Sequence, residues 1–203
     1  MALFSPSMDL SGCRCWPGAN VFEVLVKLFR YFRSSPEADE PEVIRQDVFH
    51  GIRTGILKRP VRGPVLMLDF DGVLHPGQSG SLCHLPVLEA WLRQNGEVDV
   101  VISSNWRDSH TLDQLSELFA SDLQDRIVGT IPSFFDGCRE NEILAYIRKY
   151  GIARWAAIDD RAEEFPTTGR NHLVATEYRE GLNSGHLGRV ARILGLQNRK
   201  IAE

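Results

Sequence analysis

Short apolar runs alternate with amphipathic segments along most of the chain, from residue 65 to residue 194. The runs are rich in Val, Ile, Leu and Ala, a pattern that predicts strands buried on both faces. After a first strand that begins at Val65, we expect strands over 98–102, 127–131, 155–158 and 172–175. Apolar positions three and four residues apart predict helices over 86–95, 111–119 and 139–150, and a last helix capped by Asn183 or Ser184. Strands separated by helices predict an α/β fold, a doubly wound parallel sheet with right-handed crossovers.

The first apolar run ends in two aspartates, Asp69 and Asp71, which are followed at once by Gly72. In a continuing strand their side chains would point to opposite faces, and one carboxylate would be buried without a partner, which is costly. We therefore predict that the chain leaves strand geometry at Gly72 and that the acids meet a cation, of which a divalent metal ion is the simplest. The alternative is a strand end whose acids only cap a turn or a helix. Ligands of open α/β sheets bind at this end of the strands.

The residues before the first strand predict an N-terminal arm, helix and linker over 1–42 and a main domain over 43–203. Val21 to Phe32 presents a wide apolar face, which we expect the protein's own core, a second copy, a partner protein or a membrane surface to cover. Residues 34–42 are acidic, contain two prolines and predict the linker. Helical spacing then predicts another helix, from the apolar positions Ile44, Val48, Phe49, Ile52 and Ile56.

The chain has 203 residues and a hydrophobic content of 43%, enough for one ordinary domain with an extension. Its formal net charge of −4 gives no general attraction to nucleic acids, so a polyanion contact needs a local basic cluster. A cluster before the first strand is either a solvated face or such a contact: Arg53, Lys58, Arg59 and Arg62. The chain starts without a signal-peptide pattern and has no stretch near the roughly 20 apolar residues of a membrane span, so we expect a cytoplasmic protein.

Four segments that carry polar residues occur along the chain in the order DFDGVLHP, VDVVISSNWR, CRENEIL and AIDDR. Together they resemble the four motifs of the haloacid dehalogenase (HAD) superfamily of phosphatases, over the region from Val65 to Leu194. The WR after the second motif and the DDR of the fourth are most similar to the small HAD domains of bacterial Swiss Army Knife RNA-repair proteins. The resemblance implies a Rossmann-like fold and a magnesium-dependent phosphatase.

The resemblance also implies roles for the acids of the first and fourth motifs. Asp69 would attack phosphorus to form an aspartyl-phosphate, and Asp71 would protonate the leaving group and later activate water. Asp159, Asp69 and the backbone carbonyl of Asp71 would hold Mg²⁺. Asp160 would be a water-mediated partner of the metal ion.

The second and third motifs would bind the phosphoryl oxygens. Ser103 is the first polar residue after its apolar run, with Ser104 as the fallback, and either serine could instead cap a turn. Most of the superfamily has a lysine in the third motif, whereas the matching position here holds Arg139. Arginine keeps the charge and offers a fork suited to phosphate, although a solvated arginine at a helix start is the alternative.

Residues just past the presumed phosphate-binding serine are expected to contact substrate: Ser104, Asn105, Trp106 and Arg107. Trp106 beside Arg107 could stack a base or a sugar and hold its phosphate, or Trp106 could belong to the core. We interpret His75, His84 and His110 as incidental, because no pair of them has ligand spacing on a common element.

In the HAD superfamily, enzymes for small metabolites usually carry a cap domain, inserted between the motifs, that closes over the substrate. Neither interval between the first three motifs has room for such a domain beyond the predicted helices and strands. We expect an open site, covered at most by a short hairpin flap over 77–81, that admits the phosphorylated end of something large, a nucleic acid or a nucleotide. The competing hypothesis is a HAD-fold binding or scaffold protein that is catalytically silent.

Overall fold

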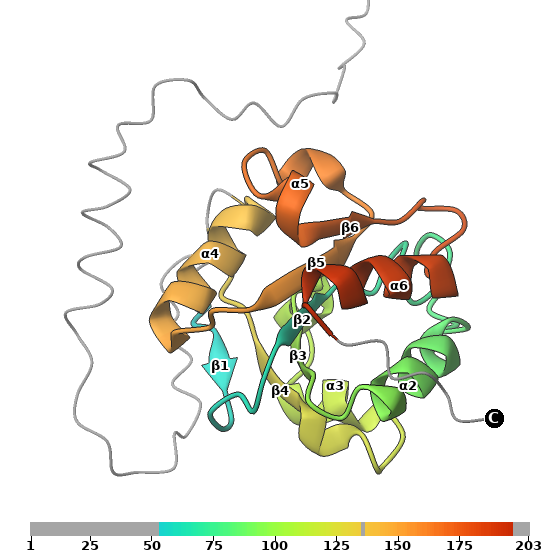
Figure 1. The fold of residues 1–203 in the computed structure, drawn as a ribbon, viewed down its shortest axis with the longest axis horizontal. Helices are drawn as coiled ribbons and strands as arrows, with labels where there is room; N and C mark the ends of the chain where they lie inside the picture. Colours follow the sequence, from blue (N-terminus) through green and yellow to red (C-terminus); the bar gives the residue numbers. More distant parts are fainter. Residues whose placement is uncertain (1–52, 135–136, 197–203) are drawn as a thin grey trace, which may run out of the picture. The chain divides into compact units, whose positions relative to one another are not determined.

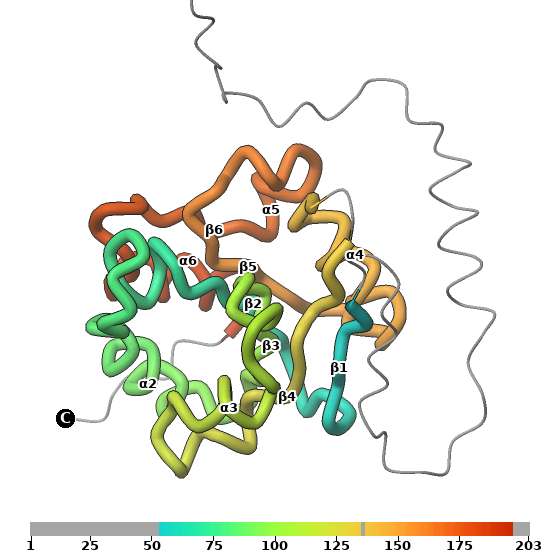
Figure 2. Tube along the Cα trace, turned by 180° about the vertical axis from the view of Figure 1, so that it is seen from behind, coloured from blue at the N-terminus to red at the C-terminus, as the bar shows by residue number. Residues whose placement is uncertain are grey.

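The strands form one mixed, mostly parallel sheet. The computed structural model describes residues 53–134 and 137–196, and within them the sheet has six strands in the order β1-β4-β3-β2-β5-β6 (Figure 1). The strands are β1 (Ile56–Leu57), β2 (Val65–Leu68), β3 (Asp99–Ile102), β4 (Ile127–Thr130), β5 (Trp155–Asp159) and β6 (Leu173–Ala175). All neighbours run parallel except β1 and β4, which are antiparallel. Figure 2, seen from behind, shows the same strand order.

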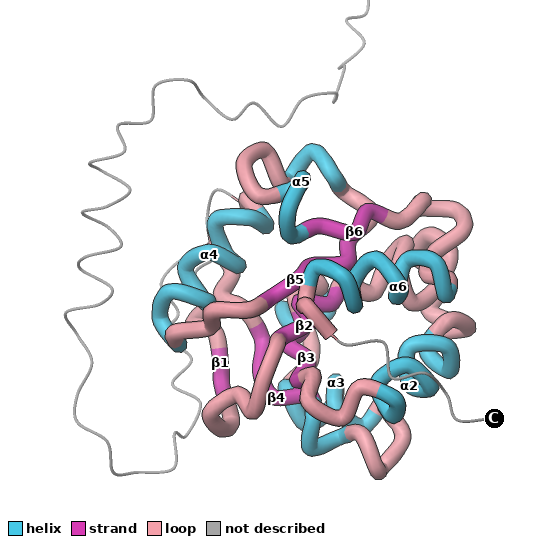
Figure 3. The backbone as a smooth tube through the Cα atoms, in the orientation of Figure 1, coloured by secondary structure: helices cyan, strands magenta, loops and turns pink. Residues whose placement is uncertain are grey.

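Helices cover both faces of the sheet, as the doubly wound prediction requires (Figure 3). They are α2 (Leu85–Gln94), α3 (Leu112–Glu117), α4 (Arg139–Tyr150), α5 (Gly169–His172) and α6 (Ser184–Ile193). Leu66 and Leu68 of β2 pack in one hydrophobic cluster with α2, α3 and α6. Val65 and Met67 pack in a second cluster with α4. Because successive strand residues face opposite sides, β2 is buried on both faces and fixes the centre of the fold.

Local capping signals place the helices where the sequence predicts them. Helix α4 has the predicted bounds and ends at Gly151, whose φ of 65° is left-handed and favours glycine. Asn183 caps α6, since its side chain accepts a hydrogen bond from the His186 amide. Thr111 caps α3 in the same way, through the Gln114 amide.

The predicted helix ending at Ile56 is wrong at that residue. Ile56 lies in β1, where it pairs with Thr130, and Leu57 pairs with Gly129. A Cβ atom at Gly129 would lie 2.2 Å from the Ile56 carbonyl oxygen, so this glycine permits the close approach of β1. The Tyr146 hydroxyl also donates to that oxygen at 2.8 Å. The antiparallel β1 makes the sheet mixed rather than wholly parallel.

Residues 77–81 contain a turn at 77–78 and no strand, rather than the predicted hairpin flap. Positive φ angles at Gly77, Gly80 and Leu82 interrupt the extended geometry that paired strands need. The Gly77 amide instead donates to the Tyr178 carbonyl at 2.7 Å, and the Gly77 carbonyl accepts from Gly72. This loop is therefore held against the chain that follows β6.

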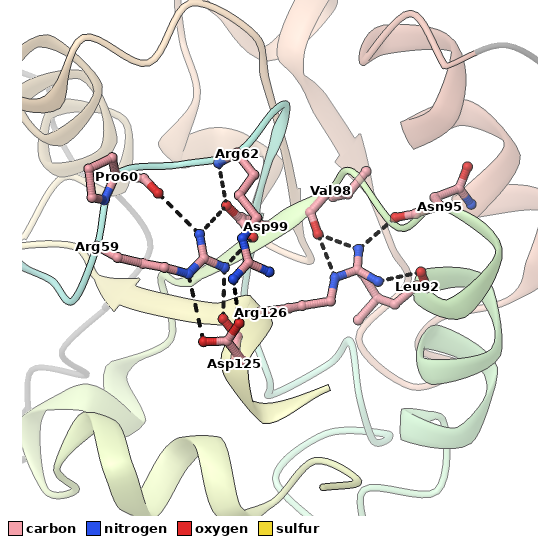
Figure 4. Close-up of polar contacts among 9 residues, drawn as sticks. All are labelled: Arg59, Pro60, Arg62, Leu92, Asn95, Val98, Asp99, Asp125 and Arg126. Atoms are coloured by element: carbon pink, nitrogen blue, oxygen red, sulfur yellow. Dashed lines mark hydrogen bonds and ion pairs between the residues drawn. The ribbon is translucent and has the colours of Figure 1, made fainter. Parts of the chain in front are cut away.

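Two of the basic residues before β2, Arg59 and Arg62, are engaged in ion pairs near the amino end of β3 (Figure 4). Arg59 makes two hydrogen bonds to Asp99, at 2.7 and 2.9 Å, and Arg62 bonds to Asp125 at 2.6 Å. Arg126 lies beside them and donates to the carbonyls of Leu92, Asn95 and Val98. Asp99 begins β3, so four residues of strand, about 13 Å, separate this cluster from the carboxyl edge. Arg59 and Arg62 are therefore paired with acids at the base of the sheet, and their contact with a phosphate or a nucleic acid stays a prediction.

The remaining predictions about the amino-terminal part of the chain fall on residues that the structure does not describe. They are the division at residue 42, the apolar face from Val21 to Phe32 and the predicted helix up to residue 52. In the described ranges 53–134 and 137–196, the helices are all too short or too polar to cross a bilayer.

Candidate active site

Three adjacent parallel strands deliver the predicted site residues to one edge. Leu68 at the end of β2 is in register with Ile102 of β3 and Ile158 of β5. The Asp69 amide donates to the Ile158 carbonyl at 3.1 Å, and the Ser103 amide donates to the Leu68 carbonyl at 2.8 Å. Asp69, Ser103 and Asp159 are all buried there. This is the edge at which open α/β sheets bind ligands.

Gly72 turns the chain out of the strand direction, as predicted. Its φ is +67°, and a Cβ atom there would lie 2.8 Å from Cγ and Oδ2 of Asp160. The Gly72 carbonyl also accepts a hydrogen bond from Thr176 Oγ1 at 2.8 Å. The turn after β2 is therefore packed directly on Asp160, the acid that follows β5, and a side chain at position 72 would push the two segments apart.

Three carboxylates converge at this edge. Each of Asp69, Asp159 and Asp160 offers an oxygen within 4.8 Å of the others. Burial, and then the charge of Asp69, raise the pKa of both Asp159 and Asp160. Asp159 Oδ1 accepts from the Arg161 amide at 3.0 Å, whereas the buried Oδ2 has no hydrogen-bond partner among the described residues. Clustered carboxylate oxygens with an unpartnered buried atom fit a hard divalent cation such as Mg²⁺.

Arg139 supplies the positive charge beside these acids. It begins α4, is only 1% exposed, and places Nε 3.6 Å from Asp159 Oδ2. Its Nη2 donates to Asn105 Oδ1 at 3.0 Å, but Nε and Nη1 have no hydrogen-bond partner in the described part of the chain. The alternative of a solvated arginine at a helix start is therefore wrong. Buried, unpartnered guanidinium donors suit an oxyanion such as phosphate.

The two serines after β3 have different environments. Ser104 Oγ accepts from the Trp106 amide at 3.4 Å and caps the short 3₁₀ helix over Asn105–Asp108, so the turn-cap alternative describes Ser104. Ser103 Oγ is buried and has no hydrogen-bond partner within the described residues. Ser103 is thus the serine whose hydroxyl is available to a ligand.

Arg107 is engaged inside the protein rather than exposed at the site mouth. Its buried guanidinium pairs with Glu142 of α4 at 2.7 Å and donates to the Ser103 carbonyl at 2.5 Å. Burial lowers the pKa of Arg107 and raises that of Glu142. Glu142 also accepts from the Phe134 amide at 2.8 Å. These contacts tie the loops after β3 and β4 to α4. Arg107 Nε is buried and has no hydrogen-bond partner among the described residues, so the contact of Arg107 with substrate stays a prediction.

Trp106 and His75 surround the Asp71 side chain. The Trp106 indole N–H donates to Asp71 Oδ2 at 3.1 Å, and His75 Nε2 lies 3.4 Å from Asp71 Oδ1. Burial, and then Asp69, raise the pKa of Asp71. The His110 ring stacks on Trp106 with ring centroids 5.5 Å apart, so a substrate base would compete with His110 for that face. Sequence reasoning treated His75 as incidental; its place four residues after Asp71 was the available signal.

A family model matches the part of the chain that carries these residues. The family model described as the HAD domain in Swiss Army Knife RNA repair proteins matches residues 65–187, more than half of the chain. The matched span contains all four motifs and every site residue named above. No curated protein and no solved structure matches the chain.

Proposed function

Because the chain belongs to the family of HAD domains found in Swiss Army Knife RNA repair proteins, we propose that it is a magnesium-dependent phosphohydrolase acting through Asp69. The observation that carries the proposal is a set of buried polar atoms without hydrogen-bond partners beside Asp69. Within the described residues these include Ser103 Oγ, two guanidinium nitrogens of Arg139 and Asp159 Oδ2. Such atoms are costly unless a ligand satisfies them, and a phosphate with a cation has the matching charges.

In the first step, an Asp69 carboxylate oxygen attacks phosphorus. The bond from phosphorus to the leaving oxygen breaks, and Asp71 gives its proton to that oxygen. The products are an alcohol, an aspartyl-phosphate on Asp69 and an ionised Asp71. The side chain of Asp71 is outside the three-carboxylate cluster and 26% exposed, which leaves it free for proton transfer.

In the second step, water attacks the phosphorus of the aspartyl-phosphate. Asp71 accepts a proton from this water, the bond from phosphorus to the Asp69 oxygen breaks, and inorganic phosphate leaves. Both carboxyl groups return to their starting states. Asp71 therefore acts as acid and then as base.

The phosphoryl oxygens would be held by Ser103 and Arg139. Preorganised buried donors aimed at developing negative charge supply a large part of catalysis in acyl and phosphoryl transfer. Asn105 orients Arg139 through its side-chain oxygen, which is the role we propose for this residue in place of a direct substrate contact.

Asp69, Asp159 and the backbone carbonyl of Asp71 would hold Mg²⁺, with Asp160 acting through water. When bound, the ion would neutralise the carboxylates and the phosphate charge so that two anions can approach each other.

We also propose that the substrate is a phosphomonoester on something large, a nucleic-acid end or a nucleotide. The support for a large substrate is that the segments between the first three motifs are short. Between Asp71 and Ser103 the chain forms one helix, α2, and between Ser103 and residue 134 it forms short helical segments and β4. No inserted domain lies between these described motifs to close over a small substrate.

The test is turnover of an aryl phosphate by the purified protein with Mg²⁺ and with a chelator, for the parent and for Asp69→Asn. We expect activity only in the parent with Mg²⁺. Equal rates in Asp69→Asn and the parent would contradict the assignment of Asp69 as the nucleophile. No turnover of any phosphomonoester, together with retained Mg²⁺ binding, would favour a catalytically silent binding or scaffold protein.

A further inference from the structure

We infer that His75 is a positioning residue which, with the Trp106 indole, holds the Asp71 carboxyl group in the orientation that protonates the leaving oxygen. This inference rests on the proposed function and deepens it. Nothing in the four motif roles requires a histidine at this position. The His75 ring lies beside the Asp71 carboxyl group.

The two oxygens of Asp71 face two different nitrogen atoms. Oδ2 accepts the indole hydrogen bond from Trp106 at 3.1 Å, and Oδ1 lies 3.4 Å from His75 Nε2. The second distance is an ion-pair distance rather than a hydrogen bond, and catalytic contacts in ligand-free proteins often tighten when substrate binds. Two anchors restrict rotation of the carboxyl group, while its exposed fraction leaves one side open to substrate.

The His75 ring is held in this place by the turn after β2. The Leu74 amide donates to the Phe70 carbonyl at 2.8 Å, and the Leu74 carbonyl accepts from the His84 amide at 2.9 Å. The ring centroid lies 5.9 Å from that of Trp106. His75 therefore packs against the same indole that anchors the other Asp71 oxygen.

A purely structural role fits the His75 ring poorly. His75 is 0% exposed, and neither ring nitrogen has a hydrogen-bond partner among the residues that the structure describes. Burying unpartnered polar atoms destabilises the folded state, a cost that its apolar neighbours Val73 and Leu74 do not incur. Asp71 Oδ1 lies 3.4 Å from His75 Nε2, so the imidazole gains a partner if it orients that carboxyl group.

The orientation of Asp71 matters most when the leaving group needs a proton. General acid catalysis contributes about 10²- to 10⁴-fold, and it depends on geometry as well as on protonation. A leaving group that departs as a stable anion needs little help from an acid. The role of His75 can therefore be separated from packing by varying the leaving group.

The experiment measures kcat/KM for a series of phosphate esters, from an alkyl phosphate through phenyl phosphate to 2,4-dinitrophenyl phosphate. With Mg²⁺ present, kcat/KM reports the steps up to release of the leaving group. His75→Phe keeps a ring against Trp106 but removes Nε2. We expect it to lose about 10- to 100-fold on the alkyl and phenyl esters and less than about threefold on the dinitrophenyl ester.

Three further variants make the result specific. His75→Gln keeps an N–H donor and should recover much of the loss on poor leaving groups. Trp106→Phe removes the other anchor of Asp71 and should show the same dependence on the leaving group. His110→Phe retains a ring stacked on Trp106 without touching Asp71, and it should show no such dependence.

Loss of the same size on every ester, or no loss on any, in a folded His75→Phe variant would overturn the inference and leave His75 as a packing residue. If His75→Phe does not fold, His75→Leu takes its place, because it also lacks Nε2, and loss of the same size on every ester or no loss on any would again overturn the inference. Failure of the proposed function is a different result, in which the parent itself has no turnover or Asp69→Asn retains it.

Discussion

Arg139 Nε lies 3.6 Å from Asp159 Oδ2 across the carboxyl edge of the sheet, and neither atom has a hydrogen-bond partner among the described residues. The arginine begins α4 and the aspartate ends β5, so the pair joins two motifs that are 20 positions apart in the sequence (159 − 139). An ion pair this buried and this poorly bonded is expensive by itself. A phosphate on the arginine and a cation on the aspartate would complete both partners, which is the geometry on which the proposed function rests.

Substitutions of Arg139 should distinguish the effect of its positive charge from the effect of its planar guanidinium geometry. Arg139→Met removes both, and we expect kcat on an aryl phosphate to fall about 100- to 1,000-fold. Arg139→Lys keeps the charge but shortens the reach to Asn105, so its loss should be smaller. Arg148→Met, at the exposed last turn of the same helix, is the matched control and should leave steady-state kinetics unchanged. Equal activity in Arg139→Met and Arg148→Met would contradict the proposal that Arg139 binds the phosphoryl group.

The cluster of three carboxylates should destabilise the folded protein when no metal ion is bound. Asp159 has a folded pKa raised above its ordinary 3.8 by burial and by Asp69, so protonation favours the folded state. The contribution of Asp159 to stability should therefore rise as the pH falls through its folded pKa of about 7 toward 3.8, and the difference between the parent and Asp159→Asn measures it. Asp159→Asn lacks this charge. At neutral pH without metal it should unfold at a higher temperature than the parent, and its free energy of unfolding should be larger by about 1 kcal/mol.

Mg²⁺ should reverse that order. The ion should raise the melting temperature of the parent and have little effect on Asp159→Asn, because binding to the folded state stabilises it. Thermal unfolding with Mg²⁺ and with chelator, for both proteins, gives the four values needed. A parent whose melting temperature is indifferent to Mg²⁺ would contradict the assignment of the three carboxylates to a metal ion.

Arg107 should matter for stability more than for substrate binding. Arg107→Met leaves Glu142 buried without its partner, and we expect a loss of about 3–5 kcal/mol in the free energy of unfolding by urea. The double variant Arg107→Met/Glu142→Leu removes both charges and should regain a large part of that loss. A stable Arg107→Met variant with a strongly raised KM would instead restore the substrate contact that the sequence predicted.

The residues at the ends of the central strands could be predicted because each signal is local. An apolar run that stops at Asp69 or Ser103 is visible in a few letters, and so are the bounds of α4 between Arg139 and Gly151. Pairings between distant segments were not visible in this way. Strand β1 exists because Ile56 reaches Thr130, and the place of Arg107 depends on Glu142, 35 residues away.

His75 shows a further limit of sequence reasoning. Its place four residues after Asp71 is a weak signal by itself, and it becomes informative only with the turn at Gly72, which brings the ring to Asp71. The hairpin predicted over 77–81 failed for a related reason, since glycines suit several kinds of turn and the choice depends on Tyr178 far along the chain.

An open site should prefer large phosphomonoesters. A panel of sugar phosphates, nucleotides, phosphopeptides and phosphate-ended oligonucleotides, compared by kcat/KM, measures this preference. We expect the oligonucleotide or nucleotide to be the best substrate, because no inserted domain in the described motif region excludes it. Preference for a small sugar phosphate by about 100-fold or more, nearly 3 kcal/mol in transition-state binding, would refute the open-site interpretation.

The most direct measurement is of the covalent intermediate. Parent protein mixed with Mg²⁺ and 2,4-dinitrophenyl phosphate, quenched rapidly in acid and digested, should yield a phosphorylated peptide that contains Asp69. The Asp71→Asn variant should accumulate more of it, because hydrolysis of the aspartyl-phosphate needs the Asp71 base. Asp69→Asn should yield none. Turnover without any phosphoryl group on Asp69 in the parent or in Asp71→Asn, or undiminished turnover in Asp69→Asn, would contradict the proposed mechanism.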